Sequence, residues 1–158
     1  MSTNYPEIQP ESSPIVPGET NPPSFSAMDG AVLDEMLADL GEGSEDLIIG
    51  LINTFLTHTP TIFADMEKAL VENDIVTLHR AAHTLKSSSA SLGVMQLSEL
   101  SKQMETQLKP LLNTPLNTPE LDKINNIIHQ VALLRTIFQQ ARTSLITYQL
   151  KLENRPQE

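Results

Sequence analysis

The chain of 158 residues contains no cysteine and no tryptophan, and aromatic residues make up only 4% of it. The absence of cysteine excludes disulfides, catalysis by a thiolate, iron–sulfur clusters and zinc sites built on cysteine. The scarcity of aromatic residues argues against a surface on which the bases of single-stranded nucleic acid could stack. The formal net charge of −10 argues against binding to a phosphate backbone. We therefore expect no nucleic-acid partner.

Basic residues are missing from the first part of the sequence. No Lys or Arg precedes Lys68, whereas residues 1–67 hold 12 of the 20 acidic residues. No run of apolar residues approaches the roughly 18 that a membrane span requires, because Gly50 and Asn53 interrupt the longest one. The N-terminus has neither the basic nor the apolar segment of a secretory signal. These absences predict a cytoplasmic protein without a membrane partner.

Prolines concentrate at the N-terminus, where residues 1–25 contain six of the eleven, among Ser, Thr, Glu and Asn. Such a segment cannot bury enough apolar surface to offset the entropy lost on ordering, which predicts a disordered tail or linker. A docking peptide is the alternative, but the segment has no Arg beside a PxxP run. The folded domain is expected over residues 26–155.

Apolar residues recur at helical spacing from residue 26 onward. Asp29 or Ser26 is predicted to cap a short helix that Gly41 then stops. Ser44 is predicted to cap a second helix. Pro60 interrupts the apolar pattern of this helix, which resumes beyond it, so we expect a kink rather than an end.

A third helix is predicted to begin near Asp74 and is separated by Gly93 from a fourth, which Pro110 closes. The residues Thr118, Pro119 and Glu120 are typical of the start of a helix. This last helix would have roughly 34 residues and span about 50 Å, so we expect its end to project or fray. Its inward residues are expected to be Leu121, Ile124, Ile128, Val131, Leu134 or Arg135, Phe138, Ala141, Leu145, Tyr148 and Leu152.

The pattern as a whole predicts an all-α protein. No segment alternates with a period of two residues for long, so no sheet is expected. Four long amphipathic helices with short loops predict an antiparallel four-helix bundle. The short helix before them would cap this bundle at its N-terminal side.

Residues 78–105 carry the candidate functional site. At 100° per residue, the apolar side chains of the third helix cluster in one direction, and His83 points roughly 160° away from them. His83 is therefore predicted to be exposed on the side of the bundle. Residues at helical spacing around it are His79, Arg80, Lys86, Ser87 and Ala90.

This arrangement suits the transfer of a phosphoryl group. A neutral imidazole is a good nucleophile near pH 7. Arg80 and Lys86 disfavour the charged ring and would attract the oxygens of an arriving phosphoryl group. The small residues Ser87 and Ala90 leave room for the active site of another protein. The sequence has no Gly-rich phosphate loop, Walker motif or carboxylate dyad, which predicts that the phosphoryl group comes from another protein and leaves to another.

The residues Ala82-His83-Thr84-Leu85-Lys86, the small residues that follow, Leu92-Gly93 and Glu105 form a pattern that resembles the histidine-containing phosphotransfer (HPt) domain family of two-component signalling. The resemblance implies that His83 is the phosphoacceptor and that Lys86 orients or stabilises the phosphoryl group. Arg80 is expected to support this site through its charge and its helical spacing from the ring. The resemblance also implies that Glu105 reaches from the next helix to within hydrogen-bonding range of the ring. Ser87 departs from the family, because many members have Gly there, and we expect at most slower or more selective docking.

The resemblance implies a phosphorelay intermediate that accepts a phosphoryl group from the aspartate of one receiver domain and passes it to that of another. It would be a carrier rather than an enzyme, with no ATP site and no cofactor of its own, since the Mg²⁺ belongs to the receiver. The expected partners are response-regulator receiver domains and a hybrid sensor histidine kinase. One alternative is a helical interaction module that binds receivers or kinases without being phosphorylated. Another is a metal site on His79 and His83, but no carboxylate lies at matching spacing, so we expect no metal.

Overall fold

The computed structural model describes residues 27–114 and 121–156. The predicted tail and the predicted helix start at Thr118 lie outside these residues. In the described part of the chain the elements are all helical, with no strand. They are Gly30–Leu40 (α1), Glu45–Glu72 (α2), Ile75–Ser91 (α3), Met95–Leu108 (α4), the 3₁₀ helix Lys109–Asn113 (η1) and Leu121–Glu153 (α5).

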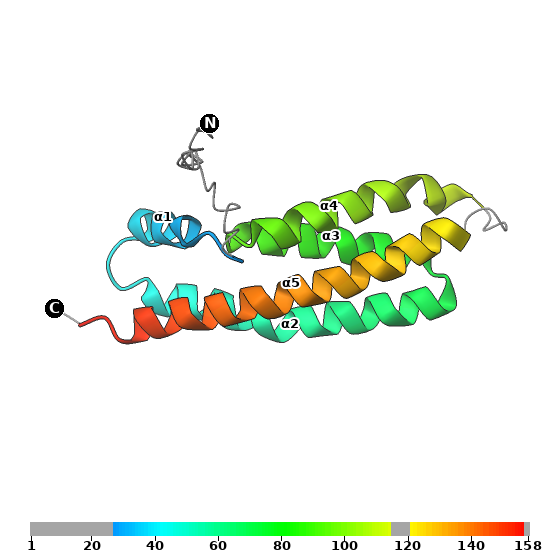
Figure 1. Ribbon diagram of the computed structural model, residues 1–158. Coiled ribbons are helices and arrows are strands. Elements are labelled where there is room, and N and C mark those ends of the chain that lie inside the picture. The colour runs from blue at the N-terminus through cyan, green and yellow to red at the C-terminus, as the bar shows by residue number, and fades with distance from the viewer. Residues whose placement is uncertain (1–26, 115–120, 157–158) are drawn as a thin grey trace, which may run out of the picture.

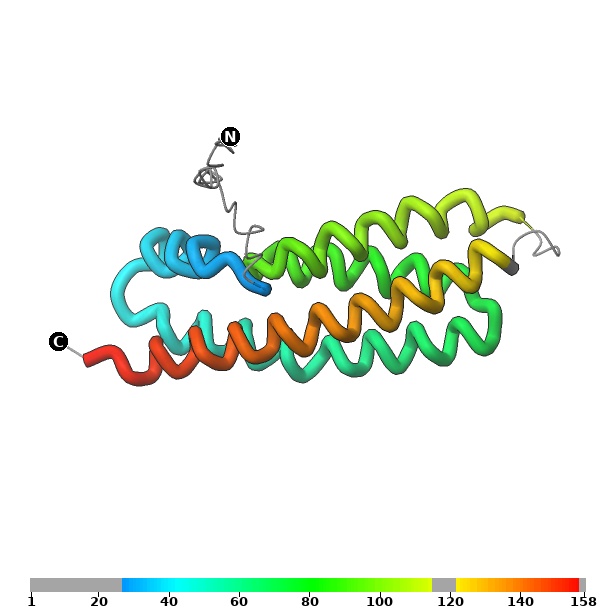
Figure 2. The backbone as a smooth tube through the Cα atoms, viewed as in Figure 1, coloured from blue at the N-terminus to red at the C-terminus, as the bar shows by residue number. Residues whose placement is uncertain are grey.

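Helices α2, α3, α4 and α5 lie side by side and alternate in direction, as the ribbon shows (Figure 1). The tube view makes the path plain, with short turns joining α2 to α3 and α3 to α4 (Figure 2). Helix α1 lies at one end of this bundle, the end at which α5 finishes. The prediction of an all-α antiparallel four-helix bundle with a short N-terminal helix is confirmed.

Side-chain hydrogen bonds cap the starts of α1 and α3. The Asp29 side chain accepts from the backbone N–H of Ala31 at 3.0 Å, and Asp74 accepts from that of Thr77 at 3.0 Å. Both therefore cap their helices as predicted. Ser44 stands at the start of α2, but its hydroxyl donates to the Gly41 carbonyl at 2.6 Å and caps nothing. The position was predicted correctly and the role of the side chain was wrong.

Helix α2 continues through Pro60 as one element of 28 residues, so the prediction that the helix does not end there is confirmed. Among the described residues α2 is long and apolar enough to cross a membrane, by length and composition alone. This is weak evidence for a span, because core helices of bundles pass the same test. The side chains of Ile52, Phe55, Phe63 and Met66 are buried within the bundle. The absence of a membrane span therefore stays a prediction.

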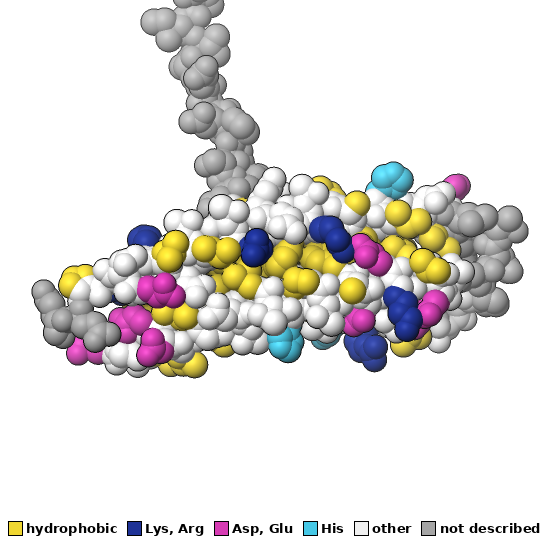
Figure 3. Space-filling model, turned by 90° about the horizontal axis from the view of Figure 1, so that it is seen from below, with side chains coloured by type: hydrophobic (Ala, Val, Ile, Leu, Met, Phe, Trp, Pro, Cys, Tyr) yellow, Lys and Arg dark blue, Asp and Glu magenta, His cyan; other side chains and the backbone are white. Residues whose placement is uncertain are grey.

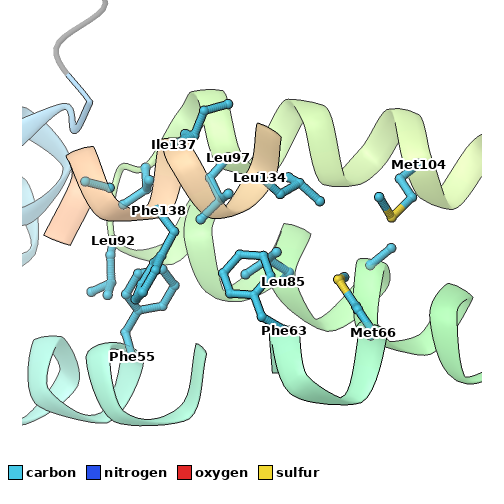
Figure 4. Close-up of a cluster of buried hydrophobic side chains, with 14 of the residues drawn as sticks. Phe55, Phe63, Met66, Leu85, Leu92, Leu97, Met104, Leu134, Ile137 and Phe138 are labelled. Atoms are coloured by element: carbon cyan, nitrogen blue, oxygen red, sulfur yellow. The ribbon is translucent and has the colours of Figure 1, made fainter. Parts of the chain in front are cut away.

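The core lies along the axis of the bundle, where side chains from α2, α3, α4 and α5 converge (Figure 4). The ring of Phe138 on α5 lies 5.8 Å from that of Phe55 and 5.7 Å from that of Phe63, in tilted or edge-on arrangements. Each large apolar side chain buried in this way contributes about 1.5–3 kcal/mol. The core thus fixes α3, which carries the candidate site, between its neighbours on both sides.

The sequence-based prediction of the inward face of α5 was wrong at its beginning. Ile128, which was predicted to face inward, is exposed, and Ile127, which the prediction did not include, is buried. Farther along, Leu134 is buried, whereas Arg135 lies outside, paired with Glu67 and placed over the ring of Phe63. A fixed 100° per residue fails here because α5 packs on different neighbours along its 33 residues.

The end of α5 does not project, because α1 covers it. Tyr148 and Leu152 are buried, and the Tyr148 hydroxyl donates to the Asp34 carboxylate of α1 at 2.6 Å. Burial and this hydrogen bond raise the pKa of Tyr148. The expectation of a projecting or frayed end was therefore wrong, because the apolar residues of the last turns have α1 as a partner.

Candidate functional site

His83 lies on the solvent face of α3, where 59% of its side chain is exposed. The opposite face of the helix is buried, including Leu78, Ala82 and Leu85. The predicted exposure of His83 is confirmed. An exposed imidazole on a helix held by the core presents its ring in a fixed place to another protein.

The carboxylate of Glu105 brings the ring and a lysine together. Glu105 belongs to α4, which packs along α3, and its side chain is only 17% exposed. One oxygen, Oε1, lies 2.6 Å from Nδ1 of His83, and the other, Oε2, accepts from Nζ of Lys86 at 2.6 Å. The expectation that Glu105 reaches the ring from the next helix is confirmed as geometry. The position of the Lys86 ammonium on Glu105 is a contact that the sequence did not predict.

The charge state of Glu105 decides which nitrogen of His83 is free. The hydrogen bond from Lys86 is the main cause that holds the pKa of Glu105 below its ordinary value; burial opposes it and the hydrogen bond with His83 adds to it. Glu105 is therefore ionised at neutral pH and only accepts hydrogen bonds. Nδ1 of His83 must then carry a proton, and in a neutral ring Nε2 keeps its lone pair.

The other predicted residues surround the ring without touching it through their polar groups. The Ser87 hydroxyl donates to the backbone carbonyl of His83 at 3.2 Å and so turns toward the helix. The Arg80 side chain makes no hydrogen bond or ion pair within the described part of the chain, and its backbone carbonyl accepts from Thr84. The roles predicted for Ser87 and Arg80 stay predictions.

A metal site is not assembled around these histidines. In residues 27–114 and 121–156, no group of three or more His, Cys, Asp or Glu side chains is placed to hold a metal ion. His129 instead pairs through Nδ1 with the backbone carbonyl of Asn125 at 2.7 Å. His58 lies on α2, in the wall of a groove described next.

A groove of about 620 Å³ borders the His83 face of α3, and sequence reasoning missed it. Its walls come from α1, α2 and α3, and its lining is mostly apolar with several hydroxyl groups. The lining residues are Met36, Leu51, Thr54, Phe55, Thr57, His58, Thr59, Thr61, Ile62, Thr84, Ser88, Ser91 and Leu92. The sequence contained one signal for exposed apolar surface on α2. Leu47 and Leu51 widen the apolar stripe of this helix beyond the residues that the core buries, and both side chains are exposed.

Charges are distributed unevenly around the bundle. The space-filling view from below shows a band of hydrophobic side chains along this face and acidic side chains gathered near the end with the α1–α2 turn (Figure 3). Glu42, Glu45, Asp46 and Glu153 line a hollow at that end. Of these, Glu42, Glu45 and Asp46 belong to the part of the sequence that precedes the first basic residue.

In the described part of the chain, the bundle exposes a histidine whose Nδ1 lies against a carboxylate and whose Nε2 has no hydrogen-bond partner, an arrangement that suits a phosphotransfer module. The model of the Hpt domain family matches residues 50–143. The chain therefore belongs to the Hpt domain family, and it is a phosphorelay intermediate between receiver domains.

Two solved structures resemble the chain. One is the Saccharomyces cerevisiae histidine phosphotransfer signaling protein Ypd1, co-crystallised with the receiver domain of its downstream response regulator Ssk1. It is 22% identical, with a TM-score of 0.63 over 77% of this chain and 93% of that chain. The other is the histidine-containing phosphotransfer protein B (HptB) of Pseudomonas aeruginosa PAO1, 25% identical, with a TM-score of 0.51 over 77% of this chain and 98% of that chain. A search of the curated proteins finds no match.

Proposed function

We propose that His83 is the phosphoacceptor, receiving a phosphoryl group from the aspartate of one receiver domain and passing it to the aspartate of another. The observation that carries this proposal is an exposed imidazole whose Nδ1 lies 2.6 Å from Oε1 of Glu105, while its Nε2 has no hydrogen bond to any described residue. The protein acts as a carrier without a cofactor of its own, because the Mg²⁺ is bound by the receiver. A hybrid sensor histidine kinase supplies the donor receiver, and the exchange takes place in the cytoplasm.

The transfer is an in-line displacement at phosphorus. The lone pair of Nε2 forms the N–P bond while the P–O bond to the receiver's aspartate breaks, and that aspartate leaves as a carboxylate. The proton on Nδ1 stays in place, so the ring gains positive charge as the N–P bond forms. Glu105 lies against Nδ1 and stabilises this charge. Transfer to the second receiver is the reverse of these steps.

The proposal is tested by locating the phosphate. After incubation with a phosphorylated receiver, the chain is expected to carry an acid-labile, base-stable phosphate on Nε2 of His83, identified by NMR of the ring nitrogens and phosphorus. Phosphate on Nδ1 or on His79 would contradict the geometry. Receiver binding with no phosphate on the chain would favour the alternative of an interaction module that is not phosphorylated.

The receiver is proposed to cover the groove beside His83. A specific interface buries about 800 Å² on each partner, far more than the surroundings of one ring. On the α4 side of the ring the exposed residues include Glu99 and Lys102, whereas on the α2 side the exposed Leu51 lines the groove. Exposed apolar surface of this kind is typical of a binding site. The similar Ypd1 was solved with a receiver domain, which supports the same kind of partner here.

Leu51→Glu is expected to weaken receiver binding at least about tenfold, since it places a charge that must be desolvated within the covered groove. Leu51 is 39% exposed in the free protein, so the substitution should leave the bundle folded. The matched control is Leu133→Glu, on α5 and outside the groove, where the side chain is 50% exposed. Titration calorimetry with the receiver measures both. Equal effects of the two substitutions would place the receiver elsewhere.

A further inference from the structure

The groove between α1, α2 and α3 begins where the described chain begins. Leu92 belongs to its lining and precedes Gly93, whose backbone carbonyl accepts from the N–H of Asp29 at 2.8 Å. The first described residues therefore lie at the end of the groove that Leu92 lines, beside the turn between α3 and α4 (Figure 1). Residues 1–26 are attached to the bundle at this end of the groove.

We propose that residues 19–25, which lie outside the described residues, occupy this groove and compete with the receiver for it. The segment combines a carboxylate at Glu19, a pair of prolines and an aromatic ring at Phe25. It is a docking peptide, the alternative that the sequence left open, with its binding site in the same chain. The competition rests on the proposed function, in which the receiver covers the groove, whereas the occupancy of the groove is independent of it.

The lining of the groove suits the side chain of Phe25. The other three phenylalanines of the chain are buried in the core, so Phe25 is the one that the described bundle leaves without a place. The groove has a volume of about 620 Å³ and a mostly apolar lining, which includes the exposed Leu51. A segment that cannot form a core of its own can bury an aromatic ring against a groove that the folded bundle provides.

The length of the segment matches the length of the groove. Prolines favour the extended polyproline II conformation, which rises about 3.1 Å per residue, so the chain from Phe25 back to Glu19 spans roughly 19 Å. Along α3, the helix from its C-cap Leu92 back to Arg80 spans about 18 Å at 1.5 Å per residue. With Phe25 beside Leu92, Glu19 therefore comes to the level of Arg80.

The charges at this far end of the groove are complementary. The segment before the described chain contains Glu but no Lys or Arg, whereas α3 contains two basic residues and no Asp or Glu. Of these two, Lys86 already contacts Glu105. Arg80 is exposed, lies one turn before Thr84 of the groove wall, and its side chain has no ion pair with any described residue. Its guanidinium is therefore available for a charge-assisted hydrogen bond with the Glu19 carboxylate.

Occupancy of the groove regulates access to His83. A receiver that must displace the segment binds with a dissociation constant raised by the inverse of the open fraction, about threefold when the groove is filled in roughly two of three molecules. The His83 side chain is 59% exposed and is not part of the groove lining. The segment therefore weakens receiver binding and leaves the nucleophile itself unchanged.

A spin label tests the occupancy without any receiver. The chain has no cysteine, so Thr20→Cys provides a single attachment site near the far end of the segment. In the full chain, the label is expected to broaden the methyl NMR signals of Ile62, at the far end of the groove, more than that of Met36, at the near end. A segment held only where it joins the bundle stays near its attachment and would broaden Met36 more, which would overturn the proposal.

Phe25→Ser in the labelled chain removes the aromatic anchor and is expected to reverse this order, so that Met36 is broadened more than Ile62. The matched control is Tyr5→Ser, which removes the other aromatic residue before the described chain and should leave Ile62 the more broadened. Equal behaviour of the two variants would contradict the role of Phe25 and overturn the proposal. Circular dichroism of each variant checks that the bundle is retained.

Titration calorimetry with the receiver tests the competition. Phe25→Ser is expected to lower the dissociation constant at least about threefold, and Tyr5→Ser to leave it unchanged. If Leu51→Glu weakens receiver binding but Phe25→Ser does not strengthen it, the segment does not compete and the proposal is overturned. If neither substitution changes binding, the receiver lies elsewhere and the proposed function fails at this surface, while the spin label still decides whether the segment occupies the groove.

Discussion

His83→Gln is expected to abolish phosphoryl transfer to the chain while leaving the bundle intact. The glutamine amide has no lone pair that is nucleophilic near neutral pH, so no N–P bond can form at this position. The side chain of His83 is exposed and contributes nothing to the core, so the free energy of unfolding should change by less than about 0.5 kcal/mol. Incubation with a phosphorylated receiver, followed by a gel that separates phosphorylated from free protein, measures the label.

The matched control for this substitution is His79→Gln. His79 lies one turn earlier on α3, is partly buried and makes no hydrogen bond in the described part of the chain. Its replacement should leave the label in place. A label that survives in His83→Gln, or that disappears in His79→Gln, would show that the phosphoryl group is carried elsewhere.

Gly93→Ala is expected to lower the free energy of unfolding by about 3 kcal/mol. Gly93 has a φ of +74°, a conformation that costs an L-residue about 1–2 kcal/mol. A Cβ on it would overlap the backbone carbonyl of Asp29, just before α1. The backbone N–H of Asp29 also donates to the Gly93 carbonyl at 2.8 Å, a hydrogen bond worth about 1 kcal/mol that the displaced segment would lose.

Gly43→Ala is the control that isolates the contact with Asp29. Gly43 has a similar φ of +84°, but nothing lies within 4 Å of a Cβ built on it. Its replacement should cost only the conformational part, about 1–2 kcal/mol. Urea unfolding of both variants measures the difference. Equal losses would mean that the approach of α1 to the α3–α4 turn contributes nothing to stability.

The helices and their order could be predicted from the sequence because the signals are local. Asp29 and Asp74 cap their helices through contacts within three residues, and the apolar period is repeated over several turns. The exposure of His83 followed from the same period. Ser44 shows the limit of such local signals. Its hydroxyl could form a hydrogen bond within its own helix or with the preceding turn, and the geometry of that turn places it on the Gly41 carbonyl.

The functional site was predicted only in part. The pattern around His83 and its resemblance to the HPt family indicated phosphotransfer, and the resemblance indicated that Glu105 reaches the ring. The contact between Lys86 and Glu105 could not be read from the sequence, because Lys86 is three residues after His83 and seemed free to meet the phosphoryl group. Whether the Lys86 ammonium lies on Glu105 or beside the phosphoryl group depends on how closely α4 packs along α3.

By itself, the sequence determined the all-α class, the approximate bounds of α1 to α4 and the exposed histidine, because each depends on neighbours within a few turns of one helix. Only the tertiary structure decided that α1 covers Tyr148 and that Ile127 rather than Ile128 faces the core. It also decided that the backbone of Asp29, just before α1, packs against Gly93. The contact of Lys86 with Glu105 was decided in the same way. The physical reason is the same in each case. The energy of these contacts arises between segments far apart in the chain, and no local pattern specifies the distance at which two helices pack.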